Sequence, residues 1–192
     1  MAGNIIDTLY ADTSQLLRQL EERKDVSLQS FANANLRKVL LLSAASWFET
    51  RISEAVRQFA VVHSGAHPGI EGIIQRKAID RQYHNYFEWK SQKPGPFYSM
   101  FGDHCGELLK QAVNGAPALK KSLAAFLELG SLRNELVHEN FAVFAFDKTA
   151  EEVYALYQSA EGFVTFVEKT LSDPQFGRSK AEAVPAAEDF VV

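Results

Sequence analysis

A long stretch without helix-breaking residues most constrains this chain: no glycine or proline occurs between Asn4 and Ser64. Because glycine and proline interrupt regular structure more strongly than other residues, this stretch can form long helices. The six prolines, at positions 68, 94, 96, 117, 174 and 185, come later. Three of the segments in which prolines and glycines gather, 63–72, 92–97 and 114–117, are predicted to connect helices.

Apolar residues in the breaker-free stretch recur every three or four positions along one helical face, as in a buried helix. The residues on this face are Leu36, Leu40, Ala44, Phe48, Ile52, Val56 and Phe59. A shorter amphipathic helix with apolar residues from Ile5 to Leu20 precedes it, and Ser27 is the candidate N-cap of the long helix. The pattern predicts two consecutive helices before the first proline.

The apolar residues after the first proline also have helical spacing. They predict helices at 73–90, 103–113, 119–137 and 153–167. The third of these must accommodate Gly130, and Thr149 with Glu152 has the spacing of a capping box before the fourth. Only 141–146, FAVFAF, looks extended. The expected fold is all-α, an antiparallel bundle of about five to six helices.

Composition favours one folded domain. The 192 residues are 46% apolar and include 14 Phe, 6 Tyr and 2 Trp, which is enough to form one core. Residues 1–171 are predicted to form this domain, and residues 172–192, small and polar with two prolines, a mobile tail. The net charge of −4 does not attract polyanions to the molecule as a whole, so any contact with nucleic acid must be local.

Residues typical of redox, metal and membrane proteins are sparse. The single cysteine, Cys105, excludes an internal disulfide framework and a thiolate zinc cluster. His63 and His67 are four residues apart, as in some zinc sites, but a glycine and a proline interrupt a helix there and no third ligand follows. No targeting or membrane-spanning segment is recognisable. We expect a cytoplasmic protein without a metal site or cofactor.

One group of polar residues has the character of a catalytic site. The sequence from Ser131 to Phe141 reads SLRNELVHENF and places Arg133, Asn134 and His138 near the end of a predicted helix. Asn134 and His138 lie roughly 40° apart around the helix, so the amide can hydrogen-bond the imidazole and set its tautomer. Arg133 lies roughly 140° from His138. A reactive phosphate between these two would therefore need groups from elsewhere.

This motif resembles the hallmark of the HEPN superfamily of small α-helical proteins, which is Arg, a polar residue that is often Asn, three further residues and His. Three surrounding segments are similar to the RiboL-PSP-HEPN type: LELGSLRNELVHENF, the following FAVFAFDKT, and SWFETRISEAV at 46–56. The resemblance extends over most of the chain, to about Leu171.

The resemblance implies a metal-independent endoribonuclease that works as a homodimer, with the motif helices of two subunits facing one cleft. His138 would exchange a proton with the attacking 2′-hydroxyl or the leaving 5′-oxygen, since an ordinary imidazole titrates near neutral pH. Arg133 would bind the phosphate, with Asn134 beside it. The products would be a 2′,3′-cyclic phosphate and a 5′-hydroxyl, which restricts cleavage to RNA and excludes DNA. Family roles imply a toxin or defence effector with an antitoxin or regulatory partner.

Other functions are compatible with the same residues. A catalytically silent module could bind RNA, a nucleotide or a partner protein through this cleft, and a purely structural helical adaptor is a third interpretation. In the last case Arg133 and His138 would only complement the carbonyl end of their helix.

A basic and aromatic segment at 76–93 is a candidate surface for RNA. Its predicted RNA-binding residues are Arg76, Lys77, Arg81 and Lys90. Bases could stack on its aromatic rings, which are those of Tyr83, Tyr86, Phe87 and Trp89. The same rings could instead form the buried face of a helix, and we favour burial for at least half of them.

Overall fold

The computed structural model describes residues 4–65, 67–139, 141 and 144–178. Its seven α-helices are α1 (Ile5–Glu22), α2 (Val26–His63), α3 (Pro68–Ile74), α4 (Gly95–Ser99), α5 (Gly102–Gly115), α6 (Pro117–His138) and α7 (Ala150–Leu171). A π-helical turn, η1 (Gln75–Ile79), and a 3₁₀ turn, η2 (Tyr83–Asn85), lie between α3 and α4. The described residues contain no strand beyond one isolated bridge. The prediction of an all-α fold is confirmed.

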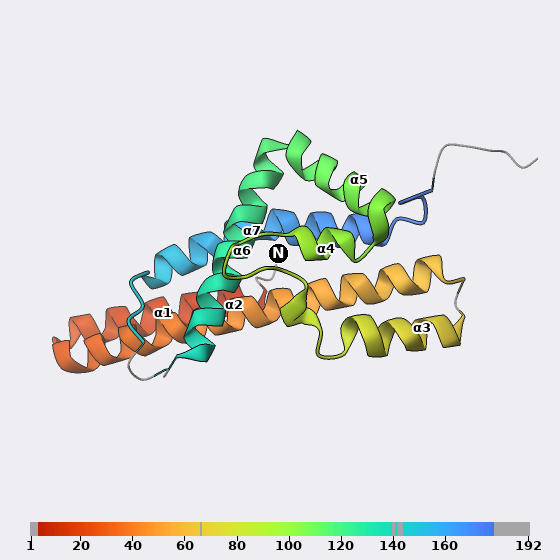
Figure 1. The fold of residues 1–192 in the computed structure, drawn as a ribbon. Coiled ribbons are helices and arrows are strands. Elements are labelled where there is room, and N and C mark those ends of the chain that lie inside the picture. The colour runs from red at the N-terminus through yellow and green to blue at the C-terminus, as the bar shows by residue number, and fades with distance from the viewer. Residues whose placement is uncertain (1–3, 66, 140, 142–143, 179–192) are drawn as a thin grey trace, which may run out of the picture.

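The long helix α2 is the centre of the bundle, because α1, α6 and α7 all pack against it. Figure 1 shows α1 beside α2, with α6 crossing them. The predicted apolar face of α2 is buried along most of its length. Phe48, on this face, packs its ring against Phe126 of α6 and Tyr157 of α7, with ring centroids 5.9 and 5.2 Å apart. These rings join three helices in one core.

The start of α2 differs from the prediction. Its N-cap is Asp25, whose carboxylate accepts a hydrogen bond of 3.1 Å from the backbone N–H of Leu28. The preceding residue, Lys24, has a φ of 56°, so the chain turns before Asp25, and the N-cap lies two residues before Ser27. The assignment of Ser27 as N-cap is therefore wrong.

Polar contacts fix α7 in the bundle. Thr149 and Glu152 form the predicted capping box at its start. Farther along, Arg51 of α2 reaches two carboxylates of α7, with 2.5 Å between Nη1 and Oε2 of Glu161 and 2.7 Å between Nε and Oε1 of Glu168. Hydrogen bonding to Glu168 is the main reason that the pKa of Arg51 lies above its ordinary value. This guanidinium joins α2 to two positions of α7 that are about two turns apart.

The segment 73–90 does not form the single helix that its periodicity predicts. After α3 and η1 the backbone turns at Arg81, whose φ is 59°, and continues into a loop closed by a bridge between Glu88 and Lys93. Three rings of this loop are buried, those of Tyr86, Phe87 and Trp89. The positive φ of Arg81 and the bridge between Glu88 and Lys93 are the features that interrupt the predicted helix.

The chain after α7 packs back onto the bundle. The ring of Phe176 meets that of Phe59 edge-on, with centroids 6.3 Å apart. Gly177 follows with a φ of 77°, and a Cβ at this position would stand 2.5 Å from Sγ of Cys105. The remainder of the predicted tail, 179–192, lies outside the described residues.

Ser122 couples α6 to α7, and its loss should measurably destabilise the bundle. Its Oγ accepts a hydrogen bond from the N–H of Phe163 and donates one to the carbonyl of Ser159, both at 2.6 Å. Because two buried hydrogen bonds are lost, Ser122→Ala should lower the free energy of unfolding by about 1–2 kcal/mol, measured by urea denaturation. Ser27→Ala, at an exposed position in α2, is the matched control and should change it by less than about 0.5 kcal/mol. Equal effects would contradict the coupling.

Candidate functional site

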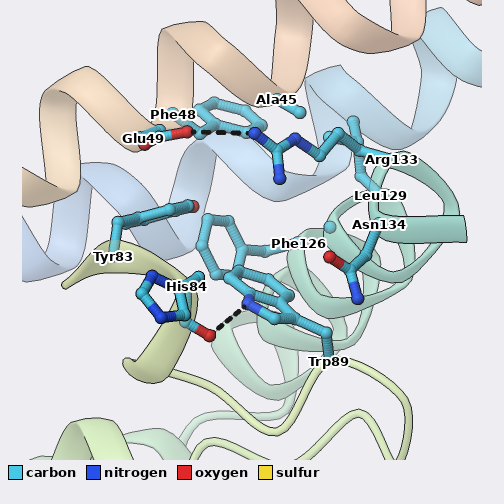
Figure 2. A pocket seen from close by; sticks show the side chains of 11 residues that line it. Ala45, Phe48, Glu49, Tyr83, His84, Trp89, Phe126, Leu129, Arg133 and Asn134 are labelled. Carbon is cyan, nitrogen blue, oxygen red and sulfur yellow. Dashed lines mark hydrogen bonds and ion pairs between the residues drawn. The ribbon is translucent and has the colours of Figure 1, made fainter. Parts of the chain in front are cut away.

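The motif residues Arg133, Asn134 and His138 all lie in the last two turns of α6. Arg133 faces α2, where its Nη2 atom is 3.7 Å from Oε2 of Glu49 (Figure 2). Both side chains are more than a third exposed, at 36% and 39%. A close charge-assisted hydrogen bond measures about 2.7–2.9 Å. The pair is therefore loose, and the guanidinium keeps donors for another anion.

A small aromatic cavity lies beside Arg133. Its walls include Phe48 of α2, Phe126 of α6, and Tyr83 and Trp89 of the loop between η1 and α4 (Figure 2). The space open to the centre of a water molecule is about 10 Å³, close to the minimum that one water needs. A nucleobase does not fit in this volume. The cavity is a packed wall beside Arg133, and a substrate must bind outside it.

The phenol of Tyr83 points into this cavity (Figure 2). Burial raises the pKa of Tyr83, the negative charge of Glu49 raises it further, and Arg133 partly opposes them. The hydroxyl therefore keeps its proton at physiological pH. Tyr83 can form hydrogen bonds in this site, but it cannot accept a proton as a phenolate base.

Gly130, one turn before Arg133, explains how the loop reaches α6. A Cβ at Gly130 would overlap the indole ring of Trp89, so only glycine lets the ring lie against the helix backbone. Trp89 is further fixed because its Nε1 donates a hydrogen bond of 3.1 Å to the carbonyl oxygen of His84. The glycine inside the predicted helix thus has a packing role next to the motif.

Asn134 does not contact His138 in the predicted way, since no hydrogen bond joins these two described residues. Its side chain lines the aromatic cavity on the side of Trp89 (Figure 2). It also lines a shallow hollow of about 580 Å³ with Lys90 and Ser91. The amide therefore lies beside the loop that carries Trp89.

His138 is the last residue of α6, and it is exposed. The chain just beyond it is held to α2, because Nζ of Lys38 donates a hydrogen bond of 2.7 Å to the carbonyl oxygen of Phe141. Lys38 is only 5% exposed and also lies 5.1 Å from the centre of the Phe141 ring. This buried cation complements the carbonyl end of α6. At 141 and 144–146, the described part of the predicted extended segment, there is no strand.

The four predicted RNA-binding residues are all exposed but do not form one group around the motif. Lys90 lines the hollow next to Asn134. Arg76 and Lys77 lie on η1, which packs against α2, and Arg81 is in the turn after it. None of these last three lines the cavity beside Arg133 or the hollow next to Asn134. The structure therefore brings only Lys90 to the motif.

Glu49, which pairs with Arg133, was not identified from the sequence. Its only signal is its place in the segment 46–56, directly after Phe48 of the buried face. The pairing depends on where α6 crosses α2, which local spacing does not reveal. His84 also lines the cavity beside Arg133. Nothing in the sequence around His84 indicates that it lies there.

The described residues hold neither a metal-binding cluster nor a membrane-spanning helix. They contain no group of three or more His, Cys, Asp or Glu side chains that could hold a metal ion. No helix among them combines the length and apolar character that crossing a membrane requires.

The fold and the motif define a helical domain of HEPN type. The family model for RiboL-PSP-HEPN matches residues 7–173, and the chain therefore belongs to this family. Comparisons with curated proteins and with solved structures gave no match. HEPN domains commonly bind RNA and often dimerise, and membership indicates a module of ribonuclease or nucleotide-binding type.

Proposed function

We propose that this protein is a metal-independent endoribonuclease that cleaves RNA by attack of a ribose 2′-hydroxyl on the adjacent phosphate. The observation that supports this most is the placement of Arg133 and His138. Both are accessible on the last two turns of one helix, and the helix belongs to a chain of the RiboL-PSP-HEPN family. A cation that binds the phosphate and an imidazole that transfers a proton are two of the groups that this reaction needs.

Arg133 is suited to the phosphate because its ion pair with Glu49 is long and partly exposed. Its planar guanidinium can bind two phosphate oxygens at once, and its charge stabilises the negative charge that builds up there.

Local positive charge attracts RNA to the surface around Arg133, since the protein as a whole is acidic. Lys90, in the hollow next to Asn134, is the basic residue placed to contact a neighbouring phosphate. Arg76, Lys77 and Arg81 would contact more distant parts of a long RNA. A homodimer would place two such sites together, and we propose a role as a toxin or defence effector restrained by an antitoxin or regulatory protein.

A second function is binding of RNA or a nucleotide without cleavage. One observation favours it: Asn134 lies toward Trp89 and does not hold the His138 imidazole. An imidazole that Asn134 does not orient would be a weaker catalyst than one that it holds.

The test is cleavage of a short RNA by the purified protein in the presence of EDTA. We expect products with 2′,3′-cyclic phosphate and 5′-hydroxyl ends, identified by mass spectrometry, because the reaction needs no metal. The matched substrate has the same sequence with a 2′-deoxy sugar at the cleaved position, and it should remain intact. Cleavage of the deoxy substrate, or cleavage that EDTA abolishes, would contradict the mechanism. Binding without cleavage would support the second function.

A further inference from the structure

We propose that Glu49 is the general base of this site, taking the proton of the 2′-hydroxyl while His138 protonates the leaving oxygen. The inference rests on the proposed function, because it concerns how the same cleavage is carried out. Transesterification of RNA needs two proton transfers, one at the attacking oxygen and one at the leaving oxygen. A single His138 performs only one of them in each turnover.

The position of Glu49 fits the proton acceptor. Its carboxylate lies 3.7 Å from the Arg133 guanidinium and is 39% exposed at the edge of the aromatic cavity. A phosphate bound to Arg133 brings its oxygens within about 3 Å of the guanidinium, and the neighbouring 2′-hydroxyl then lies close to the carboxylate. His138 is five residues farther along α6, a rise of about 7.5 Å and a rotation of about 140°. In the proposed homodimer, the imidazole that protonates the leaving oxygen would therefore come from the second subunit.

The other groups that face Glu49 are less suited to accept a proton. They are Arg133 of α6, and Tyr83 and His84 of the loop. Arg133 is permanently charged, and burial keeps the proton on Tyr83. In Figure 2 the Tyr83 ring lies between Glu49 and the His84 ring. The carboxylate of Glu49 is the remaining base next to the guanidinium.

The proton and bond changes balance over one turnover. The 2′-oxygen forms a bond to phosphorus and gives its proton to Glu49, while the bond from phosphorus to the 5′-oxygen breaks and that oxygen receives a proton from the His138 imidazolium. Glu49 then releases its proton to water and His138 regains one from water. No metal or other reactant is consumed.

The pH dependence of cleavage tests this assignment. An ordinary glutamate has a pKa of about 4.3 and an ordinary histidine about 6.5. A carboxylate base with an imidazolium acid gives a bell-shaped profile whose acidic limb comes from the carboxylate and whose basic limb comes from the imidazolium. Two His138 side chains from a dimer would instead give both limbs to imidazoles. The acidic limb of the wild-type profile in EDTA should therefore depend on the Glu49 carboxylate.

Glu49→Gln should lower kcat by about 100-fold or more, leave KM nearly unchanged, and remove the acidic limb of the profile. Glu49→Asp should restore part of the rate and the limb. Glu54→Gln is the matched control, because Glu54 lies on the same helix and pairs with Arg57 at 2.6 Å on an exposed face; it should behave like the wild type. Circular dichroism verifies that each variant is folded.

Each outcome decides the assignment. An acidic limb that persists in Glu49→Gln would overturn it, and loss of this limb in His84→Asn would assign the base to His84 instead. A raised KM with unchanged kcat would show that Glu49 only positions Arg133, which also overturns the proposal. A wild-type protein that cuts no RNA would overturn the proposed function together with this inference.

Discussion

Replacing His138 or Arg133 with alanine is expected to lower the rate of RNA cleavage by at least about 100-fold, because each removes a group that acts on the reacting phosphate. The His138 variant loses a proton donor, and the Arg133 variant loses the charge that stabilises the pentacoordinate phosphorus. Single-turnover cleavage of a labelled RNA in EDTA measures both. Neither residue is buried, so the fold should be preserved.

His104→Ala is the control for His138. His104 is also an exposed histidine, but it lies on α5, away from the motif. Its replacement should leave the rate within about twofold of the wild type, as is usual for surface substitutions. If His138→Ala and His104→Ala both cleave RNA at the wild-type rate, His138 takes no part in the mechanism.

The substitution Gly130→Ala is expected to give the largest loss of stability among small changes in α6. A Cβ at this position overlaps the Trp89 indole, and that ring also packs at 4.9 Å from Phe87 and 6.0 Å from Phe126, measured between ring centroids. Alanine favours a helix over glycine by about 1 kcal/mol, but overpacking costs about 1–3 kcal/mol and can cost more. We expect a net loss, seen as a midpoint of thermal unfolding lowered by several degrees.

Gly72→Ala is the matched control for this substitution. Gly72 also lies in a helix, α3, but a Cβ there would meet no atom within 4 Å. The control should be neutral or slightly stabilising, because alanine restricts the unfolded chain. Equal midpoints for the two variants would mean that Trp89 moves aside without cost, and the packing role of Gly130 would be wrong.

The parts of the fold that the sequence predicts well are those set by local spacing. The apolar face of α2 repeats every three or four residues over its length, and Thr149 with Glu152 marks the start of α7, so both were recognised. The prediction of one helix over 73–90 was wrong, because the spacing of the aromatic residues in this segment resembles that of a helix. In the structure the backbone turns at Arg81, and the rings of Tyr86, Phe87 and Trp89 pack into the core from a loop. This turn depends on tertiary packing, which local spacing does not reveal.

Only the residues of the site that lie on α6 could be predicted from the sequence. Arg133, Asn134 and His138 form a motif because they are near in sequence. Glu49 is far from them in the chain and becomes a neighbour only where α6 crosses α2. The direction of Asn134 also depends on the loop that holds Trp89, since this loop provides the wall that the amide faces.

The close approach of Gly177 to Cys105 allows the turn after α7 to be followed by chemical labelling of the natural cysteine. Cys105 is the single cysteine of the chain and is partly exposed, and the turn after α7 lies close to its sulfur. A maleimide dye can therefore be attached at one defined place without engineering a cysteine. Because the turn lies close to the sulfur, the rate of attachment should rise when this turn moves away from α5. The same rate measured with RNA present shows whether binding changes the contact between the turn and α5.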